Sequence, residues 1–273
     1  MKFFVLLGSA VSLASAMCSH GTSLSPRSDS IAAPSFGYTG TIGPLGWHSI
    51  ASGNLECAIG EEQSPIDILP GVISSVSGTT LNVQLQNYAH GAELENLGTT
   101  LEAFANGTMF LNNKVHSLRQ FHFHTPSEHR IDGEHYPMEV HFVFESADHD
   151  LAVLGFLIEV AGPGETSLPV LRNVFRHVED ASEFGEVTHT GALNFDQLRR
   201  HVRDSDVFQY SGSLTTPPCA QNVAFNIVRN PINIDVSVYK RVKKILKFNS
   251  RYTQNHPGEK NLLDFARDIL DAN

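Results

Sequence analysis

Three histidines stand on two segments whose residues alternate as in β-strands. In Phe121-His122-Phe123-His124, both imidazoles should point to one face and both phenylalanines to the other. A turn is predicted at Ile131-Asp132-Gly133-Glu134, and alternation resumes in Met138-Glu139-Val140-His141-Phe142, which should be an antiparallel neighbour. His141 can therefore complete a face of three imidazoles.

Three imidazoles on one face suit a catalytic zinc ion. They leave the fourth tetrahedral position free for water, whereas structural zinc sites use four protein ligands. A His-x-His pair is weak evidence by itself, because histidines in strands more often hydrogen-bond within the core. The surrounding residues must therefore decide between a metal site and ordinary core histidines.

The elements that must position these histidines are mainly strands. Their β-branched and aromatic content predicts strands over residues 119–124, 138–145, 151–160 and 222–229. Apolar residues at helical spacing predict helices over residues 168–178, 238–246 and 262–270. From Phe36 onward there is no linker, repeat or low-complexity break. The sequence thus predicts one mainly β domain with a large sheet and a few peripheral helices.

The N-terminal residues predict secretion. Lys2 precedes an apolar run that ends at Ala14, and Ala14-Ser15-Ala16 has small residues where a signal peptide is cleaved. Residues 1–16 should be that signal peptide rather than a membrane anchor, because a bilayer span needs about 20 apolar residues. Residues 17–34 are rich in serine and should form a flexible or processed arm, and residues 35–273 should form the domain.

The charge and later composition restrict the partners. With 29 acidic and 19 basic residues the net charge is −10, which disfavours nucleic acid and anionic membrane surfaces. No later stretch is apolar and long enough to span a membrane. The protein is therefore expected to be secreted and extracellular, while the sequence leaves its oligomeric state open between a monomer and a dimer.

Several motifs occur in the order found in the alpha carbonic anhydrases, and the chain resembles that family from about Phe36 to Arg251. The motifs are Phe36-Gly37-Tyr38, Gln63-Ser64-Pro65-Ile66-Asp67-Ile68, Gln120-Phe121-His122-Phe123-His124, Ser127-Glu128-His129, Glu139-Val140-His141, Leu151-Ala152-Val153-Leu154-Gly155 and Ser213-Leu214-Thr215-Thr216-Pro217-Pro218. The resemblance implies a twisted, mostly antiparallel central sheet. It also implies reversible hydration of carbon dioxide to bicarbonate and a proton, with a side activity on esters.

The resemblance assigns the zinc ligands to His122, His124 and His141, and none of them is substituted. Each ring should be held by an outer partner that fixes its orientation and tautomer. The implied partners are Gln120 for His122, Glu139 for His141 and the backbone carbonyl of Asn249 for His124.

The resemblance also implies residues around the nucleophile and the substrate. Glu128 should accept the hydroxyl proton of Thr215, so that the threonine oxygen accepts a hydrogen bond from the attacking hydroxide and orients it. Carbon dioxide is apolar, and the matching pocket residues are Val143, Val153, Leu214 and Phe225, the last where the family often has tryptophan. Thr216 and Tyr38 match polar positions that order active-site water, and Tyr210 and His129 match a buried network around Glu139.

One position departs from the fastest family members, which carry a proton-shuttling histidine on the cavity wall. The corresponding residue here is Thr99, within Asn96-Leu97-Gly98-Thr99. A threonine has no usable pKa near neutrality and cannot relay protons as imidazole does. His90 is the nearest histidine in sequence that could replace it.

Two covalent features follow from secretion and from the resemblance. Extracellular family members carry cysteines at the positions of Cys57 and Cys219, which implies a disulfide and leaves Cys18 unpaired; the alternative is two buried free thiols. Asn106-Gly107-Thr108 is a sequon for N-glycosylation.

Two other functions remain open at this point. A binding or adhesion protein could keep the fold without catalysis, although the intact histidines with Thr215 and Glu128 argue against it. A zinc esterase with another natural substrate is the second alternative.

Overall fold

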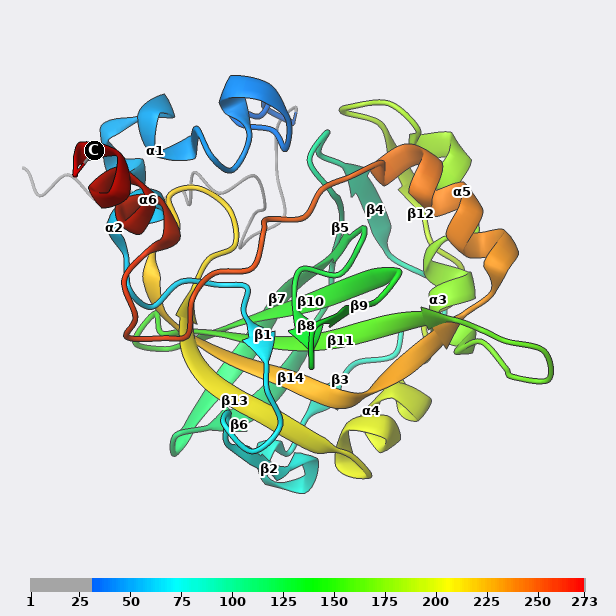
Figure 1. The fold of residues 1–273 in the computed structure, drawn as a ribbon. Helices are drawn as coiled ribbons and strands as arrows, with labels where there is room; N and C mark the ends of the chain where they lie inside the picture. The colour runs from blue at the N-terminus through cyan, green and yellow to red at the C-terminus, as the bar shows by residue number, and fades with distance from the viewer. Residues whose placement is uncertain (1–30, 273) are drawn as a thin grey trace, which may run out of the picture.

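A mixed sheet of 11 strands runs through the part of the chain that the computed structural model describes, residues 31–272 (Figure 1). Its main path has the strand order β12-β4-β5-β7-β10-β11-β14-β13-β2, and β6 joins β7 and β3 beside that path. The strands are β2 (Ser75–Ser77), β3 (Gln84–Leu85), β4 (Glu93–Asn96), β5 (Leu101–Phe104), β6 (Gly107–Leu111), β7 (Lys114–His124), β10 (Met138–Ser146), β11 (Leu151–Val160), β12 (Val187–His189), β13 (Asp206–Ser213) and β14 (Gln221–Ile234).

The four predicted strands are confirmed as β7, β10, β11 and β14, and three of them extend beyond the predicted segments, β10 by a single residue. Strand β7 begins at Lys114 and β14 continues to Ile234. All pairings in this sheet are antiparallel except that of β11 with β14, which is parallel. The predicted mainly β fold with a large, mostly antiparallel sheet is therefore confirmed.

The register of β7 and β10 brings the two histidine segments together. His141 lies opposite His122, and Glu139 lies opposite His124. The predicted turn between these strands carries Asp132 and Gly133 with positive φ and closes a small hairpin. This hairpin belongs to a second, three-stranded sheet of β1 (Asp67–Ile68), β8 (Arg130–Ile131) and β9 (Glu134–His135).

The central sheet separates two apolar clusters. Phe121 and Phe123 face the larger one, where the ring of Phe121 stacks on Phe142 at 5.0 Å and Phe123 contacts Phe175 at 4.6 Å. The smaller cluster lies on the other face, the face of the histidines, and includes Phe225. Strand alternation thus produces one mainly apolar face and one face that mixes apolar with polar side chains.

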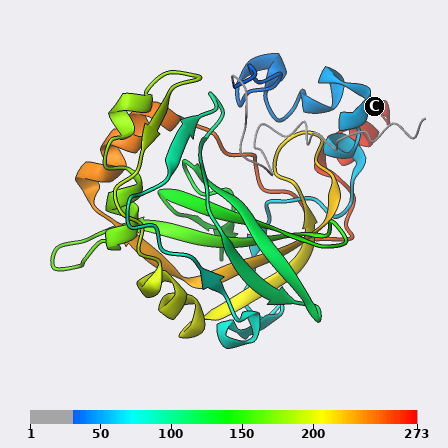
Figure 2. The ribbon, with the colours of Figure 1, turned by 180° about the vertical axis from the view of Figure 1, so that it is seen from behind.

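Short helices lie around the sheet (Figures 1 and 2). They are α1 (Trp47–Ile50), α2 (Glu56–Ile59), α3 (Pro169–Val174), α4 (Asp196–Arg203), α5 (Val236–Leu246) and α6 (Leu262–Asp271). The helix predicted over residues 168–178 is too long, because the chain leaves the helix at Phe175, whose ring packs in the core, and Val178 starts a separate 3₁₀ helix. The sequence did not predict α4, which buries only Leu198 and Val202.

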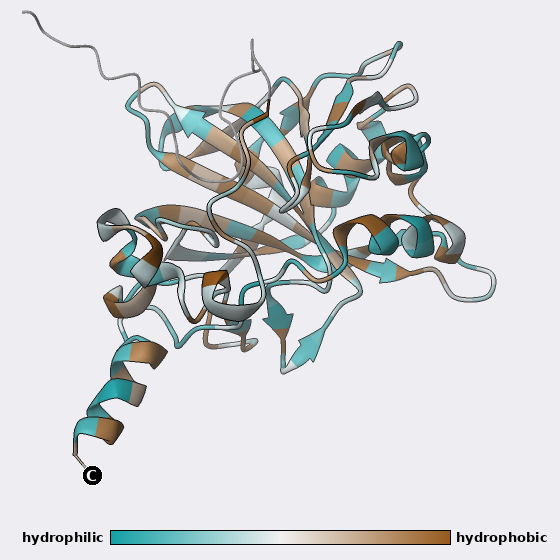
Figure 3. Cartoon of the chain, turned by 90° about the horizontal axis from the view of Figure 1, so that it is seen from above, coloured by the Kyte–Doolittle hydropathy of each residue, from teal (hydrophilic) through white to brown (hydrophobic). Residues whose placement is uncertain are grey.

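Helix α6 projects from the body next to α2 (Figure 3). Asn261 anchors its start, because the side chain accepts a hydrogen bond from Leu263 N (2.9 Å) and donates one to Gly60 O (3.0 Å). Between residues 31 and 272 no helix is long and apolar enough to cross a membrane.

The predicted disulfide between Cys57 and Cys219 is present. Both cysteines are buried with Phe36 and Trp47 in a third apolar cluster. The bridge ties α2 to the loop that follows Thr215, and Cys219 O also accepts a hydrogen bond from Gln63 Nε2 (3.0 Å). Cys18 and the segments predicted as signal peptide and arm fall outside the described residues, except for the last four positions of the arm.

We predict that the double variant Cys57→Ala/Cys219→Ala lowers the free energy of unfolding by up to about 5 kcal/mol, because the bridge closes a long loop in the unfolded chain. Urea unfolding of oxidised protein and of the double variant measures the difference. An unchanged midpoint and slope would contradict a stabilising role for the bridge.

Candidate metal centre

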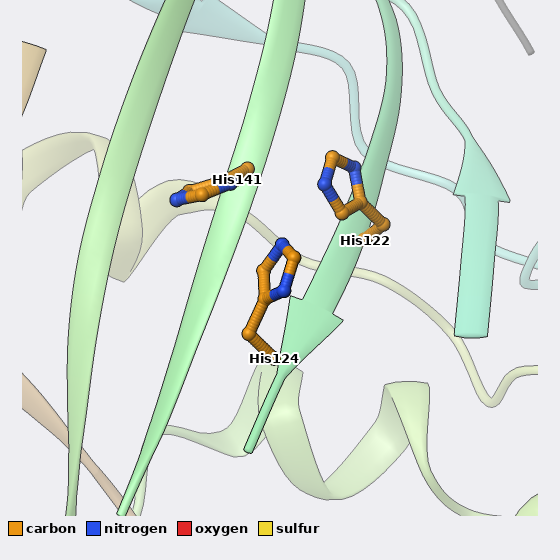
Figure 4. Close-up of side chains that lie close together, drawn as sticks. All are labelled: His122, His124 and His141. Atoms are coloured by element: carbon orange, nitrogen blue, oxygen red, sulfur yellow. The ribbon is translucent and has the colours of Figure 1, made fainter. Parts of the chain in front are cut away.

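The three histidines converge on one point between β7 and β10 (Figure 4). His122, His124 and His141 are all buried, and a ring nitrogen from each lies within 4.8 Å of the others. The ring centroids are 5.0 Å apart for His122 and His124, 5.4 Å for His122 and His141, and 4.8 Å for His124 and His141. Such proximity of three imidazoles is suited to a metal ion that bridges them.

One nitrogen of each ring donates a hydrogen bond to an oxygen that can only accept, and this fixes the tautomer of the ring. His122 Nδ1 donates to Gln120 Oε1 (2.9 Å), and His124 Nδ1 donates to the backbone oxygen of Asn249 (2.9 Å). His141 Nε2 donates to Glu139 Oε1 (2.8 Å). The nitrogens left for a metal are therefore Nε2 of His122, Nε2 of His124 and Nδ1 of His141.

Burial keeps His122 and His124 in the neutral form that binds metals. Desolvation is the main cause that lowers the pKa of His122 well below its usual value, and the neighbouring histidines lower it further. Desolvation also lowers the pKa of His124 to about 4. At neutral pH both rings therefore offer a lone pair.

Glu139 organises the loop behind the triad. Its Oε2 accepts from the backbone N–H groups of Glu128 (2.8 Å) and His129 (2.9 Å), and its Oε1 accepts from His129 Nδ1 (2.8 Å) as well as from His141. Burial alone would raise the pKa of Glu139, but the electrostatic attraction of His129 and His141 and the hydrogen bonds that they donate hold it well below its usual range. This residue is therefore a carboxylate that is fully hydrogen-bonded inside the protein.

The network continues from His129 to the loop that carries Thr215. Tyr210 Oη donates to His129 Nε2 (2.6 Å) and hydrogen-bonds Ser64 Oγ (2.8 Å), which accepts from the backbone N–H of Ser213 (3.0 Å). Desolvation raises the pKa of Tyr210 well above its usual value, so its proton stays in place. Sequence reasoning anticipated Tyr210 and His129 but assigned no role to Ser64.

Glu128 points one carboxylate oxygen at the triad. Oε1 accepts from the backbone N–H of Arg251 (2.9 Å), whereas Oε2 lies 3.5 Å from His124 Nε2 and 3.9 Å from His141 Nδ1. Among the described residues, Glu128 Oε2 and His124 Nε2 are buried without a hydrogen-bond partner. Burial raises the pKa of Glu128 to about 7, while His141, Arg251 and the hydroxyl of Thr215 lower it.

Thr215 is buried near Glu128, and its hydroxyl hydrogen-bonds the carboxyl group of Glu128, which lowers the pKa of that carboxyl. The two side chains of the expected gate therefore lie together. A pair of unpartnered buried atoms at the centre of the site is what a bound metal and its solvent would satisfy.

Arg251 is a buried residue that sequence reasoning missed. Its guanidinium donates to Ser64 O (2.7 Å), Gln63 Oε1 (2.9 Å) and Cys57 O (3.3 Å). It therefore joins the disulfide, the Gln63-Ser64 motif and, through its backbone, Glu128. No local pattern marks an arginine as buried, because arginine usually lies at the surface.

Asn249 fastens the end of β7. Its Nδ2 donates to the backbone oxygens of Thr99 (3.0 Å) and Phe123 (2.8 Å), and its Oδ1 accepts from Thr125 N (2.7 Å). Thr99 is itself buried, and its Oγ1 has no hydrogen-bond partner among the described residues. Asn249 thus links Thr99, the expected shuttle position, to the segment that holds His124.

The apolar residues expected to hold carbon dioxide lie together beside the triad. Val143, Val153 and Phe225 belong to one buried cluster, and Leu214 packs against it. The ring of Phe225 is 5.9 Å from that of His141. An apolar wall therefore adjoins the imidazoles.

The remaining expected residues lie at the edges of the site or away from it. Thr216 is half-buried, and its backbone oxygen accepts from Cys219 N (2.9 Å). Tyr38 is half-buried, and desolvation followed by the carboxylate of Glu128 raises the pKa of its phenol well above the usual value. Asn106 is exposed between β5 and β6, and His90 is exposed as well.

The cluster of His122, His124 and His141 fits a zinc ion better than a second cluster of possible ligands does. Among the described residues, His129, Glu139 and His141 also lie within reach of one another. However, His129 Nδ1 and His141 Nε2 are both already bonded to Glu139. Three free imidazole nitrogens with outer hydrogen bonds match the ligands of a catalytic zinc site.

Comparison with known proteins gives one consistent family. The profile of the eukaryotic-type carbonic anhydrases matches residues 42–273. A carbonic anhydrase of Nostoc is 31% identical over 229 residues, which cover 81% of this chain and 80% of the relative. A fungal alpha carbonic anhydrase from Aspergillus oryzae has a solved structure that is 44% identical and superposes with a TM-score of 0.82 over 85% of this chain and 98% of its own.

A bacterial structure adds a ligand to the comparison. The alpha carbonic anhydrase of Thermovibrio ammonificans, solved in complex with the inhibitor sulfanilamide, is 32% identical and has a TM-score of 0.69. The match covers 81% of this chain and 95% of that protein.

We predict that Glu139→Gln weakens zinc binding by about 10- to 100-fold, because it disrupts the acceptor that orients His141. Competition with a chromogenic chelator measures the affinity. Glu145→Gln on the same strand is the matched control, since Glu145 bonds Arg119 and His149 and not the triad. Equal affinities for Glu139→Gln and the wild-type protein would contradict this role.

Proposed function

The chain belongs to the eukaryotic-type carbonic anhydrase family and is a carbonic anhydrase enzyme, and from this premise we propose that it catalyses the zinc-dependent reversible hydration of carbon dioxide to bicarbonate and a proton. The observation that carries the proposal is the convergence of three buried imidazole nitrogens, each on a ring with a fixed tautomer. Carbon dioxide and bicarbonate are the proposed small-molecule partners.

His122, His124 and His141 would hold the zinc through the three nitrogens that their outer hydrogen bonds leave free. When bound, zinc would supply a Lewis acid that lowers the pKa of a coordinated water to about 7. We propose that three groups keep the rings oriented by accepting a hydrogen bond from each: Gln120, Glu139 and the backbone oxygen of Asn249.

Thr215 and Glu128 are the proposed residues that orient the nucleophile. A carboxylate at Glu128 can accept the proton of the Thr215 hydroxyl, so that Thr215 Oγ1 is left to accept a hydrogen bond from the attacking oxygen. That oxygen then presents its lone pair to the carbon of carbon dioxide. The hydrogen bond between the Thr215 hydroxyl and the Glu128 carboxyl group supports this arrangement.

The apolar wall is the proposed substrate pocket. Val143, Val153, Leu214 and Phe225 would hold carbon dioxide by contact with aliphatic and aromatic groups, without competing for the metal. Thr216 and Tyr38 are proposed to order the solvent at the edge of this wall. A side activity on activated esters follows from the same nucleophile, because their carbonyl carbons accept the same attack.

The proposed location is outside the cell. The signal-peptide pattern of residues 1–16 and the disulfide between Cys57 and Cys219 support secretion, since disulfides persist in oxidising compartments. Residues 17–34 are proposed as an N-terminal arm and residues 35–273 as the catalytic domain. The exposed side chain of Asn106 suits N-glycosylation of its sequon.

We predict that the secreted protein contains one zinc ion per chain and hydrates carbon dioxide in a stopped-flow assay. His124→Ala should lose most of the zinc and of the activity, because two imidazoles leave an incomplete set of ligands. His149→Ala is the matched control, since His149 is an exposed residue bonded to Glu145. Sulfanilamide, the inhibitor in the Thermovibrio ammonificans complex, is expected to inhibit this activity. Full hydration activity in His124→Ala with zinc retained would overturn the ligand assignment.

We predict that turnover rises steeply with the concentration of an imidazole-type buffer. With a water pKa of about 7 and a reprotonation rate near 10¹⁰ M⁻¹s⁻¹, proton release to plain water is limited to roughly 10³ s⁻¹. Thr99→His should raise turnover at low buffer, whereas Thr99→Asn, which cannot titrate near neutrality, should not. A rate well above that limit and independent of buffer would show that an internal shuttle such as His90 operates.

A further inference from the structure

A second cleft is lined by residues of the β6–β7 hairpin, of the start of β11 and of strands β13 and β14. Its volume is about 450 Å³, within the range of small-molecule sites. Its lining residues come from both apolar clusters. Leu111 belongs to the larger cluster and Ala224 packs against it, whereas Phe225 belongs to the smaller one. None of the three histidines of the metal centre lines this cleft.

His116 is the buried polar group of the cleft. Its side chain is 3% exposed, and its Nδ1 has no hydrogen-bond partner among the described residues. A buried polar atom left without a partner costs about 1–3 kcal/mol. Since buried polar groups are almost always satisfied, an unpartnered imidazole that lines an open cleft indicates a ligand that completes it.

The charged groups around His116 disfavour an anion or a metal ion as the ligand. Lys114 Nζ lies 2.6 Å from an oxygen of Asp150 and 2.8 Å from one of Asp148, so the ammonium is already neutralised. An anion would meet two carboxylates. A metal cation is also disfavoured, because His116 and Asp150 are not in either group of possible metal ligands found among the described residues.

The other lining residues offer neutral donors and acceptors beside apolar surface. Gln209 Nε2 donates to Asn226 Oδ1 (2.7 Å), which leaves its Oε1 available as an acceptor. Asn112 and Asn222 add exposed amides, each with a donor and an acceptor. Leu151 adds apolar surface at the start of β11. A matching ligand has many hydroxyl groups together with a C–H face.

We propose that this cleft binds a neutral polyhydroxylated molecule of the size of a monosaccharide, with His116 and Gln209 as its main contacts. The hydroxyl groups of such a ligand satisfy the imidazole and the amides, and its C–H face covers the leucine. Binding does not require the metal, because the lining side chains include none of the proposed metal ligands or their outer partners.

The test is isothermal titration of the whole secreted protein with D-glucose, D-galactose, D-mannose and N-acetyl-D-glucosamine, with D-glucuronate and D-glucosamine as charged comparators. At least one neutral sugar should bind with one site per chain, and neither charged sugar should bind as tightly. The histidine ring resonances in ¹⁵N NMR spectra should show a shift that is absent in His116→Leu.

Variants localise the site. Gln209→Ala lies at the half-buried edge of the cleft and should weaken binding about tenfold or more, equivalent to about 1.4 kcal/mol. Gln86→Ala, in an exposed loop outside the cleft, should bind like the wild-type protein. The proposal is overturned if no neutral sugar binds saturably, if a charged sugar binds more tightly, or if both His116→Leu and Gln209→Ala leave the affinity unchanged.

Discussion

The four hydrogen bonds accepted by the buried carboxylate of Glu139 are the interaction on which the site depends. They orient His141, hold the backbone of Glu128 and His129, and lead through Tyr210 towards the loop of Thr215. The neighbouring strand leaves room for this carboxylate only because residue 155 is glycine. A Cβ there would lie 2.5 Å from Ile227 Cδ1 and 3.2 Å from Glu139 Oε1. Packing between β11 and β14 and the geometry of a metal ligand are thus set by the same position.

Burial has two opposite effects within this cluster, and both suit a metal site. Desolvation disfavours the charged form of every group, so it keeps His122 and His124 neutral and raises the pKa of Glu128. Glu139 remains charged because its donors outweigh that effect. The apolar face of the sheet, with Phe121 and Phe123, supplies the rigid support on which these side chains are held.

The sequence predicted the parts of the structure that depend on local pattern. Alternation in Phe121-His122-Phe123-His124 was sufficient to place both imidazoles on one face, and the turn at Asp132-Gly133 followed from its residue types. The limits of α3 and the length of β14 were not predicted, because tertiary packing at Phe175 and pairing with β11 decide them. The resemblance, and not the local pattern, anticipated the outer hydrogen bonds.

Contacts between segments that are distant in the sequence were the hardest to predict. Arg251 joins residues almost two hundred positions away, and Ser64 bonds Tyr210 and Ser213 across the molecule. Neither residue type indicates burial by itself. The sequence around His116 does not distinguish it from other strand histidines, and only the structure shows that it lines a cleft.

Anomalous diffraction from crystals at the zinc absorption edge tests the central claim most directly. The account predicts one strong peak within about 2.1 Å of Nε2 of His122, Nε2 of His124 and Nδ1 of His141. A strong peak between His129, Glu139 and His141 in place of that position, or no peak in protein purified and crystallised with added zinc, would contradict it.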